Sequence, residues 1–164
     1  MSLAFPPVPV GGATTLAGTL TFGLGSQPSN QLGTANVLPT DARGNFTTIY
    51  KQRTYTTAFI DSGSNGWFFD DPSLPVCGDF YCPLTALALS AVNRARDDQA
   101  EVTVSFLVDD INALTSRISA PHAAGPFGLL QTFDWGIPFF FGRKVFLALQ
   151  GARTPWGTGP YWVY

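Results

Sequence analysis

The chain has 164 residues, of which 45% are apolar and only 12% are charged, and its formal net charge is -2. This composition predicts one domain with a hydrophobic core and excludes a disordered chain. The absence of a basic patch excludes nucleic acid as an expected partner. No apolar run reaches the roughly 18 residues of a membrane-spanning helix.

The first half of the chain is expected to hold a lead-in followed by short strands. Residues 1–12 are rich in Pro and Gly, so we expect a linker or an expression scar there, and the domain proper at 13–164. Apolar alternation and a β-rich composition then predict strands, with Lys51-Gln52 as a hairpin tip. The strands predicted in this half are 18–25, 35–40, 46–50, 53–60 and 67–69.

The second half of the chain continues the same pattern. Residues 101–108 alternate clearly and predict a strand, whereas 84–92 fit a helix and a strand equally well. A helical turn capped by an Asp is expected at 109–114. The tail is expected to be irregular until 161–164. Frequent Gly and Pro and the 14 Phe favour short strands and turns, so the predicted fold class is all-β with one or two short helices.

The two cysteines, Cys77 and Cys82, lie close together among Gly and Pro residues. With one His in the chain, a four-ligand zinc site is not expected. The spacing favours a small disulfide-closed loop, which implies an oxidising compartment. Two free thiols are the alternative.

The most informative motif is Asp61-Ser62-Gly63-Ser64, which directly follows the predicted strand 53–60. This order places one carboxylate at a strand end, on a tight turn of small residues. Asp, Ser and Gly are also ordinary turn formers, so a purely structural turn is the alternative. The strand before the motif, the strand after it, and the later segment Phe140-Phe141-Gly142 favour a functional site.

These segments resemble one lobe of an aspartic peptidase of the pepsin and retropepsin type. Such lobes carry two apolar residues before Asp-Ser/Thr-Gly-Ser/Thr, matched by Phe59 to Ser64, and later two apolar residues before Gly, matched by Phe140-Phe141-Gly142. The resemblance implies that the two segments cross in a ψ-shaped loop that holds the Asp rigidly. Asp61 would then be half of a catalytic dyad, and Phe140, Phe141 and Gly142 would support it.

The resemblance also assigns roles to the residues that follow Asp61. Ser62 would bond across the dyad to the other lobe, Gly63 would let the backbone pass close to the attacking water, and Ser64 would bond the outer oxygen of Asp61. Two carboxylates about 3 Å apart share one proton, so that the ionised one activates water and the protonated one polarises the scissile carbonyl. No metal or other cofactor is expected.

More narrowly, the chain resembles an uncharacterised bacterial family of exported proteins, filed as a domain of unknown function. Its members look two-lobed, with one Asp-Ser/Thr-Gly-Ser motif in each lobe, and this chain is similar to the second lobe over most of 18–164. The stretches that carry this similarity are 59–66, 80–83, 133–143 and 157–162. One lobe cannot form a dyad, so the resemblance implies a missing amino-terminal lobe or a second copy in a homodimer as partner.

Other polar residues have simpler expected roles. Asp134 is a possible local partner for Asp61, but a turn residue ahead of the apolar run is the favoured interpretation. His122 is expected to be exposed in a loop, and the pairs Asp97-Asp98 and Asp109-Asp110 to lie in solvated turns without calcium-loop spacing. The aromatic residues near the C-terminus are expected to pack on the β-core, with a carbohydrate-stacking face as the alternative.

The function expected from the sequence is that of an aspartic-peptidase-like lobe in the periplasm or outside the cell. It would act on peptide or protein substrates, and the isolated monomer would be inactive. The alternative is a non-catalytic β-domain that binds peptide or mediates assembly in the bacterial envelope.

Overall fold

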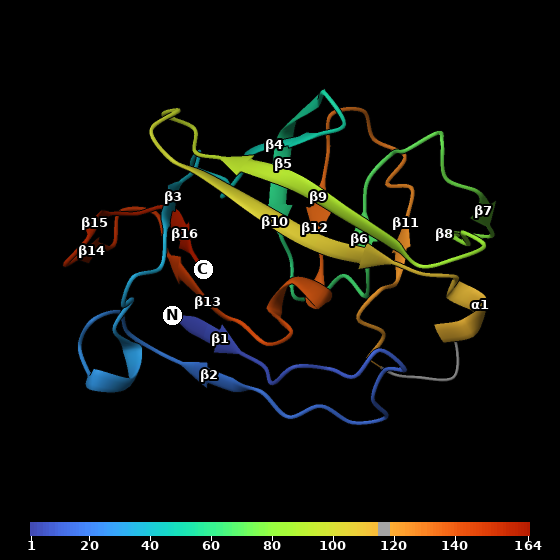
Figure 1. The fold of residues 1–164 in the computed structure, drawn as a ribbon. Helices are drawn as coiled ribbons and strands as arrows, with labels where there is room; N and C mark the ends of the chain where they lie inside the picture. The colour runs from blue at the N-terminus through green and yellow to red at the C-terminus, as the bar shows by residue number, and fades with distance from the viewer. Residues whose placement is uncertain (115–118) are drawn as a thin grey trace.

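The computed structural model describes residues 1–114 and 119–164 and is built almost entirely from β-strands (Figure 1). Two larger sheets dominate, and the strand order within them is far from the order in the sequence. The predicted all-β class is therefore confirmed. In the described ranges no helix is long and apolar enough to cross a membrane.

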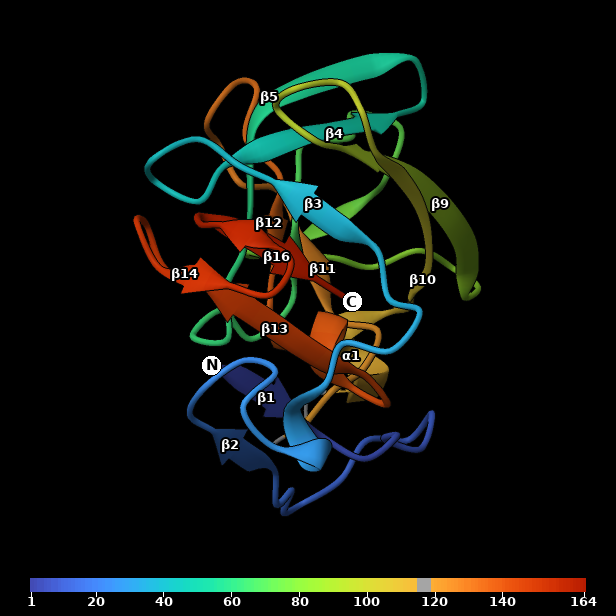
Figure 2. The same cartoon turned by 90° about the vertical axis from the view of Figure 1, so that its left-hand side faces the viewer.

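The first sheet has five strands in the order β2-β1-β13-β16-β3, which Figure 2 shows face on. β13 lies at its centre and pairs antiparallel with β1 on one side and β16 on the other, so both chain ends lie in this sheet. Its strands are β1 (Ser2–Ala4), β2 (Thr19–Thr21), β3 (Val37–Pro39), β13 (Lys144–Ala148) and β16 (Tyr161–Val163).

The second sheet has seven strands in the order β10-β9-β4-β5-β12-β6-β11. The long β9–β10 hairpin forms one edge, and the short strands β12, β6 and β11 form the other. The strands are β4 (Phe46–Tyr50), β5 (Arg53–Ile60), β6 (Trp67–Phe68), β9 (Leu87–Arg94), β10 (Glu101–Val108), β11 (Ala124–Gly125) and β12 (Asp134–Trp135).

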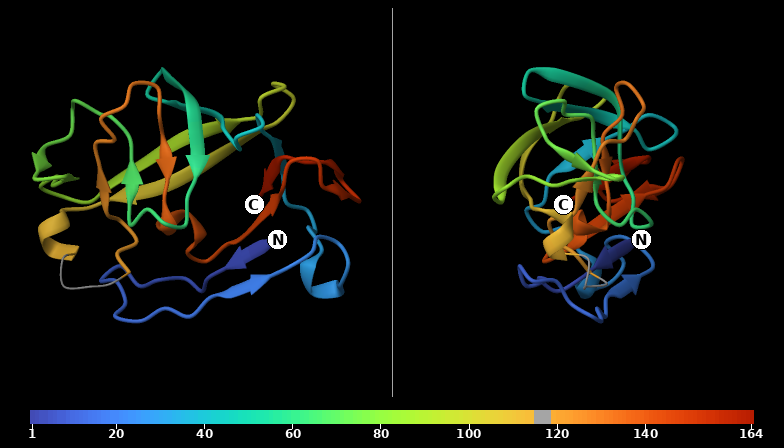
Figure 3. Two further views of the ribbon diagram at one scale, coloured as in Figure 1. Left: turned by 180° about the vertical axis from the view of Figure 1, so that it is seen from behind. Right: turned by 90° about the vertical axis from the view of Figure 1, so that its right-hand side faces the viewer.

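The remaining elements are small. Two further hairpins are formed by β7 (Val76–Cys77) with β8 (Phe80–Tyr81) and by β14 (Arg153–Thr154) with β15 (Gly157–Thr158). The helices are α1 (Ile111–Leu114) and the 3₁₀ turns η1 (Pro28–Asn30) and η2 (Ile137–Phe140). Seen from behind in Figure 3, α1 and the β14–β15 hairpin lie at opposite ends of the molecule.

Strands with a clear local pattern form where the sequence predicts them. β4, β5 and β10 have the predicted bounds, and residues 87–92 of the ambiguous segment 84–92 belong to strand β9. Lys51 and Gln52 both have positive φ (46° and 64°), as a two-residue hairpin turn of matching twist requires. Asp110 caps α1 by accepting a hydrogen bond from the backbone N–H of Asn112 (3.0 Å).

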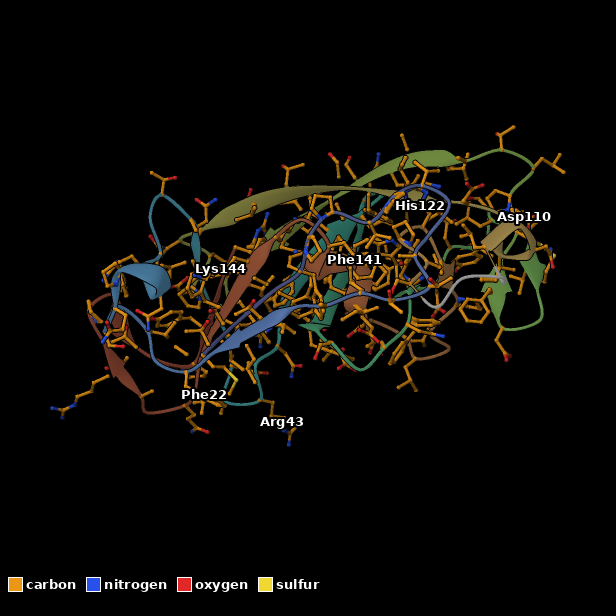
Figure 4. The ribbon with its side chains drawn as sticks, turned by 90° about the horizontal axis from the view of Figure 1, so that it is seen from below. Phe22, Arg43, Asp110, His122, Phe141 and Lys144 are labelled. Atoms are coloured by element: carbon orange, nitrogen blue, oxygen red, sulfur yellow. A yellow bond between two sulfur atoms is a disulfide. The ribbon has the colours of Figure 1, made fainter. Side chains whose placement is uncertain are left out.

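The N-terminal segment differs from the predicted lead-in. Ser2–Ala4 form β1, an inner strand of the five-stranded sheet, with register partners in both β2 and β13. In the strand predicted at 18–25, only Thr19–Thr21 pair, and the side chains of Leu20 and Phe22 are exposed. Figure 4 shows the position of Phe22. The alternation of Leu20, Phe22 and Leu24 therefore marks an edge strand rather than a buried face.

The core between the sheets is a cluster of aromatic rings. Phe133 is at its centre, stacked on Phe69 (4.8 Å between ring centroids) and on Trp135 (4.4 Å). Phe106 from β10 and Tyr55 from β5 meet Phe133 edge to face. Because Phe133 and Trp135 flank Asp134 in β12, this packing fixes the segment that passes behind the Asp61 turn.

Candidate functional site

Strand β5 delivers Asp61 to the surface of the molecule. A bulge in the β4–β5 pairing places an extra residue in β5, since Phe46 pairs with Ala58 while Thr48 pairs with Tyr55. The bulge shifts the alternation so that Tyr55, Ala58 and Ile60 are all buried. The next residue, Asp61, donates its backbone N–H to the carbonyl oxygen of Trp135 (3.0 Å) and stays partly exposed.

The turn after β5 supplies one hydrogen-bond donor to each oxygen of the Asp61 carboxylate. The backbone N–H of Gly63 donates to Oδ1 (2.7 Å), and the hydroxyl of Ser64 donates to Oδ2 (3.0 Å). A Cβ added at Gly63 would lie 3.1 Å from Oδ1, so the small residue keeps this donor close. The hydrogen bond from Ser64 is the one that the peptidase resemblance assigns to it, and the residue between Asp61 and Gly63, Ser62, is exposed.

β12 lies between the two strands that flank the Asp61 turn. It runs parallel to β5 and antiparallel to β6, and Asp134 is in register with Phe59 on one side and Phe68 on the other. The chain enters the turn along β5, leaves it along β6, and is crossed between the two by residues 134–135. This arrangement holds the turn from behind.

The glycine that lies against this turn is Gly136. A Cβ added there would lie 2.0 Å from the carbonyl oxygen of Gly66 and 2.8 Å from that of Ser64. The next backbone N–H, that of Ile137, donates to the Ser64 carbonyl oxygen (2.7 Å). No other side chain than that of glycine fits this crossing without a backbone shift.

The segment Phe140-Phe141-Gly142, which the sequence places against the turn, has three different surroundings. Phe140 lines a cavity together with Asp61. Phe141 packs edge to face on Phe5 (6.3 Å between ring centroids), and the backbone N–H of Gly142 donates to the carbonyl oxygen of Phe5 (3.1 Å). The close backbone crossing is therefore made by Gly136 and not by Gly142 as predicted, because η2 separates the two glycines and carries the chain on toward β1.

The cavity beside Asp61 has a volume of about 380 Å³ and a mostly apolar lining. It lies between the Asp61 turn and the strands of the five-stranded sheet. Within the described ranges, Asp61 contributes the one carboxylate of the lining. The lining consists of Met1, Leu3, Leu20, Ile60, Asp61, Ser62, Phe140, Val145, Leu147 and Trp162.

Asp134 is a second carboxyl group at the site, but it is buried behind the turn. Only 1% of the residue is exposed, and its Oδ1 has no hydrogen-bond partner. Burial raises the pKa of Asp134 to about 6, the nearby Ser64 hydroxyl opposes the rise, and the charge of Asp61 adds to it. The favoured sequence interpretation, a turn residue, gives way to a buried strand residue coupled to Asp61. The sequence feature that could have identified Asp134 is an acidic residue between Phe133 and Trp135, since a carboxyl group seldom lies in an aromatic run without a special role.

The other polar candidates are not among the described residues that line the cavity beside Asp61. His122 is only partly exposed, and its backbone carbonyl oxygen accepts from the N–H of Asp109, near α1 (Figure 4). Burial lowers the pKa of His122, and the charge of Asp109 opposes this. Among residues 1–114 and 119–164, no cluster of three or more His, Cys, Asp or Glu side chains is placed to hold a metal ion.

The cysteines and the C-terminal aromatic residues have structural roles. Cys77 and Cys82 form a disulfide that closes the β7–β8 hairpin. Trp162 donates its indole N–H to the carbonyl oxygen of Gly44, and Tyr164 packs edge to face on Phe139 (4.7 Å between ring centroids). These two aromatic side chains thus pack on the β-core.

A protein family described as "Protein of unknown function (DUF3443)" matches residues 1–164, the whole length of the chain. The chain therefore belongs to this family. No curated protein and no solved structure gave a match.

Proposed function

We propose that this member of the family is an aspartic-peptidase-like lobe, in which Asp61 supplies one carboxylate of a two-carboxylate dyad. The observation that carries the proposal is the support of Asp61: one donor on each oxygen, at a strand end crossed from behind by β12. A carboxylate that must activate water needs this fixed orientation, together with an exposed face.

The apolar cavity supports a peptide or protein substrate. It places apolar side chains from β1, β2 and β13 beside Asp61, where a substrate side chain would be held next to its scissile bond. Because the lining offers one carboxylate within the described ranges, the second one would come from an amino-terminal lobe or from another copy of the chain. The disulfide supports an oxidising location, in the periplasm or outside the cell.

In this mechanism the two carboxylates would face each other and share one proton. The ionised carboxylate would take a proton from the attacking water, and the protonated one would donate to the oxygen of the scissile carbonyl. Gly63 and Ser64 would hold the Asp61 oxygens in place while its charge changes. No metal or cofactor takes part in these steps.

The proposal is tested by cleavage of a denatured protein between pH 3 and pH 8. We expect an optimum at acid pH and a loss of at least about 10³-fold in Asp61→Asn, because a positioned acid–base group contributes about 10²–10⁴-fold. Asp79→Asn is the matched control, since Asp79 is an exposed hairpin carboxylate far along the chain from the turn. Its activity should equal that of the wild type.

The alternative is a β-domain that binds peptide or mediates assembly in the envelope without cleaving anything. Peptide binding in the absence of cleavage, with equal affinity in the wild type and Asp61→Asn, would favour this alternative. Cleavage that survives undiminished in Asp61→Asn would refute the proposed role of Asp61.

A further inference from the structure

We propose that Asp134 is a positioning residue for Asp61, and that its proton decides which of the two carboxyl groups receives the Ser64 hydroxyl hydrogen bond. The consequence for cleavage rests on the function proposed above. The coupling of the three side chains is independent of that function.

The argument begins with the location of the Asp134 side chain. Its backbone is fixed on both sides by β5 and β6, and the residue is 1% exposed. It is absent from the lining of the cavity that Asp61 enters. Asp134 therefore cannot touch a substrate in that cavity and cannot serve as the second catalytic carboxylate, so its influence must pass through a neighbour.

That neighbour is Ser64. Its hydroxyl donates to Oδ2 of Asp61 (3.0 Å) and also lies close enough to the carboxyl group of Asp134 to act on its pKa. A serine hydroxyl has one proton to donate and two lone pairs to accept with. It can therefore serve both carboxyl groups at once only if one of them donates to it.

A protonated Asp134 satisfies this condition. It donates to Ser64 Oγ, and Ser64 donates to Asp61, so that the hydrogen bonds run in one direction toward the exposed carboxylate. An ionised Asp134 can only accept, and it then competes with Asp61 for the single Ser64 proton. Its other oxygen, Oδ1, is buried without a partner, which penalises a charged carboxylate more than a neutral carboxyl group.

The charges around Asp134 act in the same direction. β5 places Phe59 beside Asp134, and Asp61 follows directly after the end of that strand. β6 places Phe68 and Trp67 on the other side, and η2 carries no ionisable side chain. Among the described residues, the charge that acts on Asp134 is that of Asp61. Burial and this negative charge both favour the protonated form, in keeping with a pKa of about 6.

The test is a carboxyl ¹³C NMR titration of the chain from pH 3 to pH 9. We expect a midpoint for Asp134 near pH 6, well above its ordinary value of 3.8. Asp61→Asn should lower this midpoint, because it removes the negative charge. Ser64→Ala should also shift this midpoint, because Ser64 is the group that links the two carboxyl groups. Asp79→Asn should leave it unchanged.

A second measurement is the free energy of unfolding as a function of pH in the wild type and Asp134→Asn. Between pH 4 and pH 7 the native wild type holds a proton that the unfolded chain has released, so its stability falls as pH rises through this window. Asp134→Asn has no such proton, so the difference in the free energy of unfolding between the wild type and this variant should grow toward pH 7. A midpoint for Asp134 at or below 3.8, or one that neither Asp61→Asn nor Ser64→Ala moves, would overturn the inference. The wild-type titration decides this even where Asp134→Asn does not fold.

Cleavage separates this inference from the proposed function. Asp134→Asn should keep activity and move the alkaline limb of the pH profile upward, whereas Asp61→Asn removes activity. If no variant cleaves but the titration midpoints move as expected, the proposed function fails and the coupling stands. If Asp61→Asn abolishes cleavage while Asp134→Asn leaves the pH profile unchanged, the positioning role of Asp134 is wrong and the proposed function stands.

Discussion

The conformation of the Asp61 turn depends on a few individual hydrogen bonds and on the absence of a Cβ at one glycine. Gly63 and Ser64 place their donors on the two Asp61 oxygens, and Gly136 lets the crossing segment pass directly behind them. The close approach leaves no space for a Cβ at Gly136, whereas Gly11 has no atom within 4 Å of the corresponding position. The stability of the turn is therefore predicted to depend on one glycine in particular.

Gly136→Ala should lower the free energy of unfolding by about 3 kcal/mol or more, or prevent folding, because the new Cβ meets backbone atoms that cannot yield. Gly11→Ala is the matched control and should change it by no more than about 0.5 kcal/mol. Urea denaturation measures both. A small effect of Gly136→Ala combined with a larger effect of Gly142→Ala would restore Gly142 as the crossing residue.

At the scale of the elements, hairpins and a bulge set the direction of each strand. The bulge in β5 brings Ile60 into the core and Asp61 to its end, and β12 then fills the space between β5 and β6. The β7–β8 hairpin is short and mostly exposed, and the disulfide between Cys77 and Cys82 ties its strands together. This link closes a small loop, which limits how much it restricts the unfolded chain.

Removal of the disulfide should cost about 2 kcal/mol, less than the roughly 3 kcal/mol expected of a 15-residue loop. The double variant Cys77→Ser/Cys82→Ser should stay folded and match the reduced wild type in urea denaturation. Unreduced, unfolded wild type should give no free thiol. A count of two thiols per chain would mean that the cysteines are not paired.

At the scale of the whole molecule, the site lies beside the five-stranded sheet. Both chain ends flank β13 in the five-stranded sheet, and the cavity lies between this sheet and Asp61. The exposed side chains of Leu20 and Phe22 belong to the edge strand β2 and the residue just after it. A partner that brings a second carboxylate would have to approach the exposed part of Asp61.

We therefore expect the isolated monomer not to cleave peptides. If a second copy supplies the partner, specific activity should rise with protein concentration and coincide with a dimer peak in size-exclusion chromatography with light scattering. Mixing wild type with an excess of Asp61→Asn should suppress activity, because mixed dimers hold one ionisable dyad member. Robust cleavage by a species that remains monomeric would exclude a shared dyad.

Local pattern alone determined the parts of this protein that depend on neighbours in the sequence. The bounds of β4, β5 and β10, the turn at Lys51-Gln52 and the position of Asp61 at a strand end all follow from a two-residue period and from turn chemistry. These features are encoded within a few residues, so they could be predicted without knowledge of the rest of the chain.

Only the tertiary structure decided which distant segments meet. β1 has three residues and exists because β2 and β13 pair with it, so its own sequence carries no strand signal. Gly136 and Gly142 both follow apolar residues, and packing alone determines which of them crosses the turn. Asp134 lies 70 positions after Ser64, and their contact depends on a complete sheet, because burial and long-range pairing are properties of the folded chain and not of any short segment.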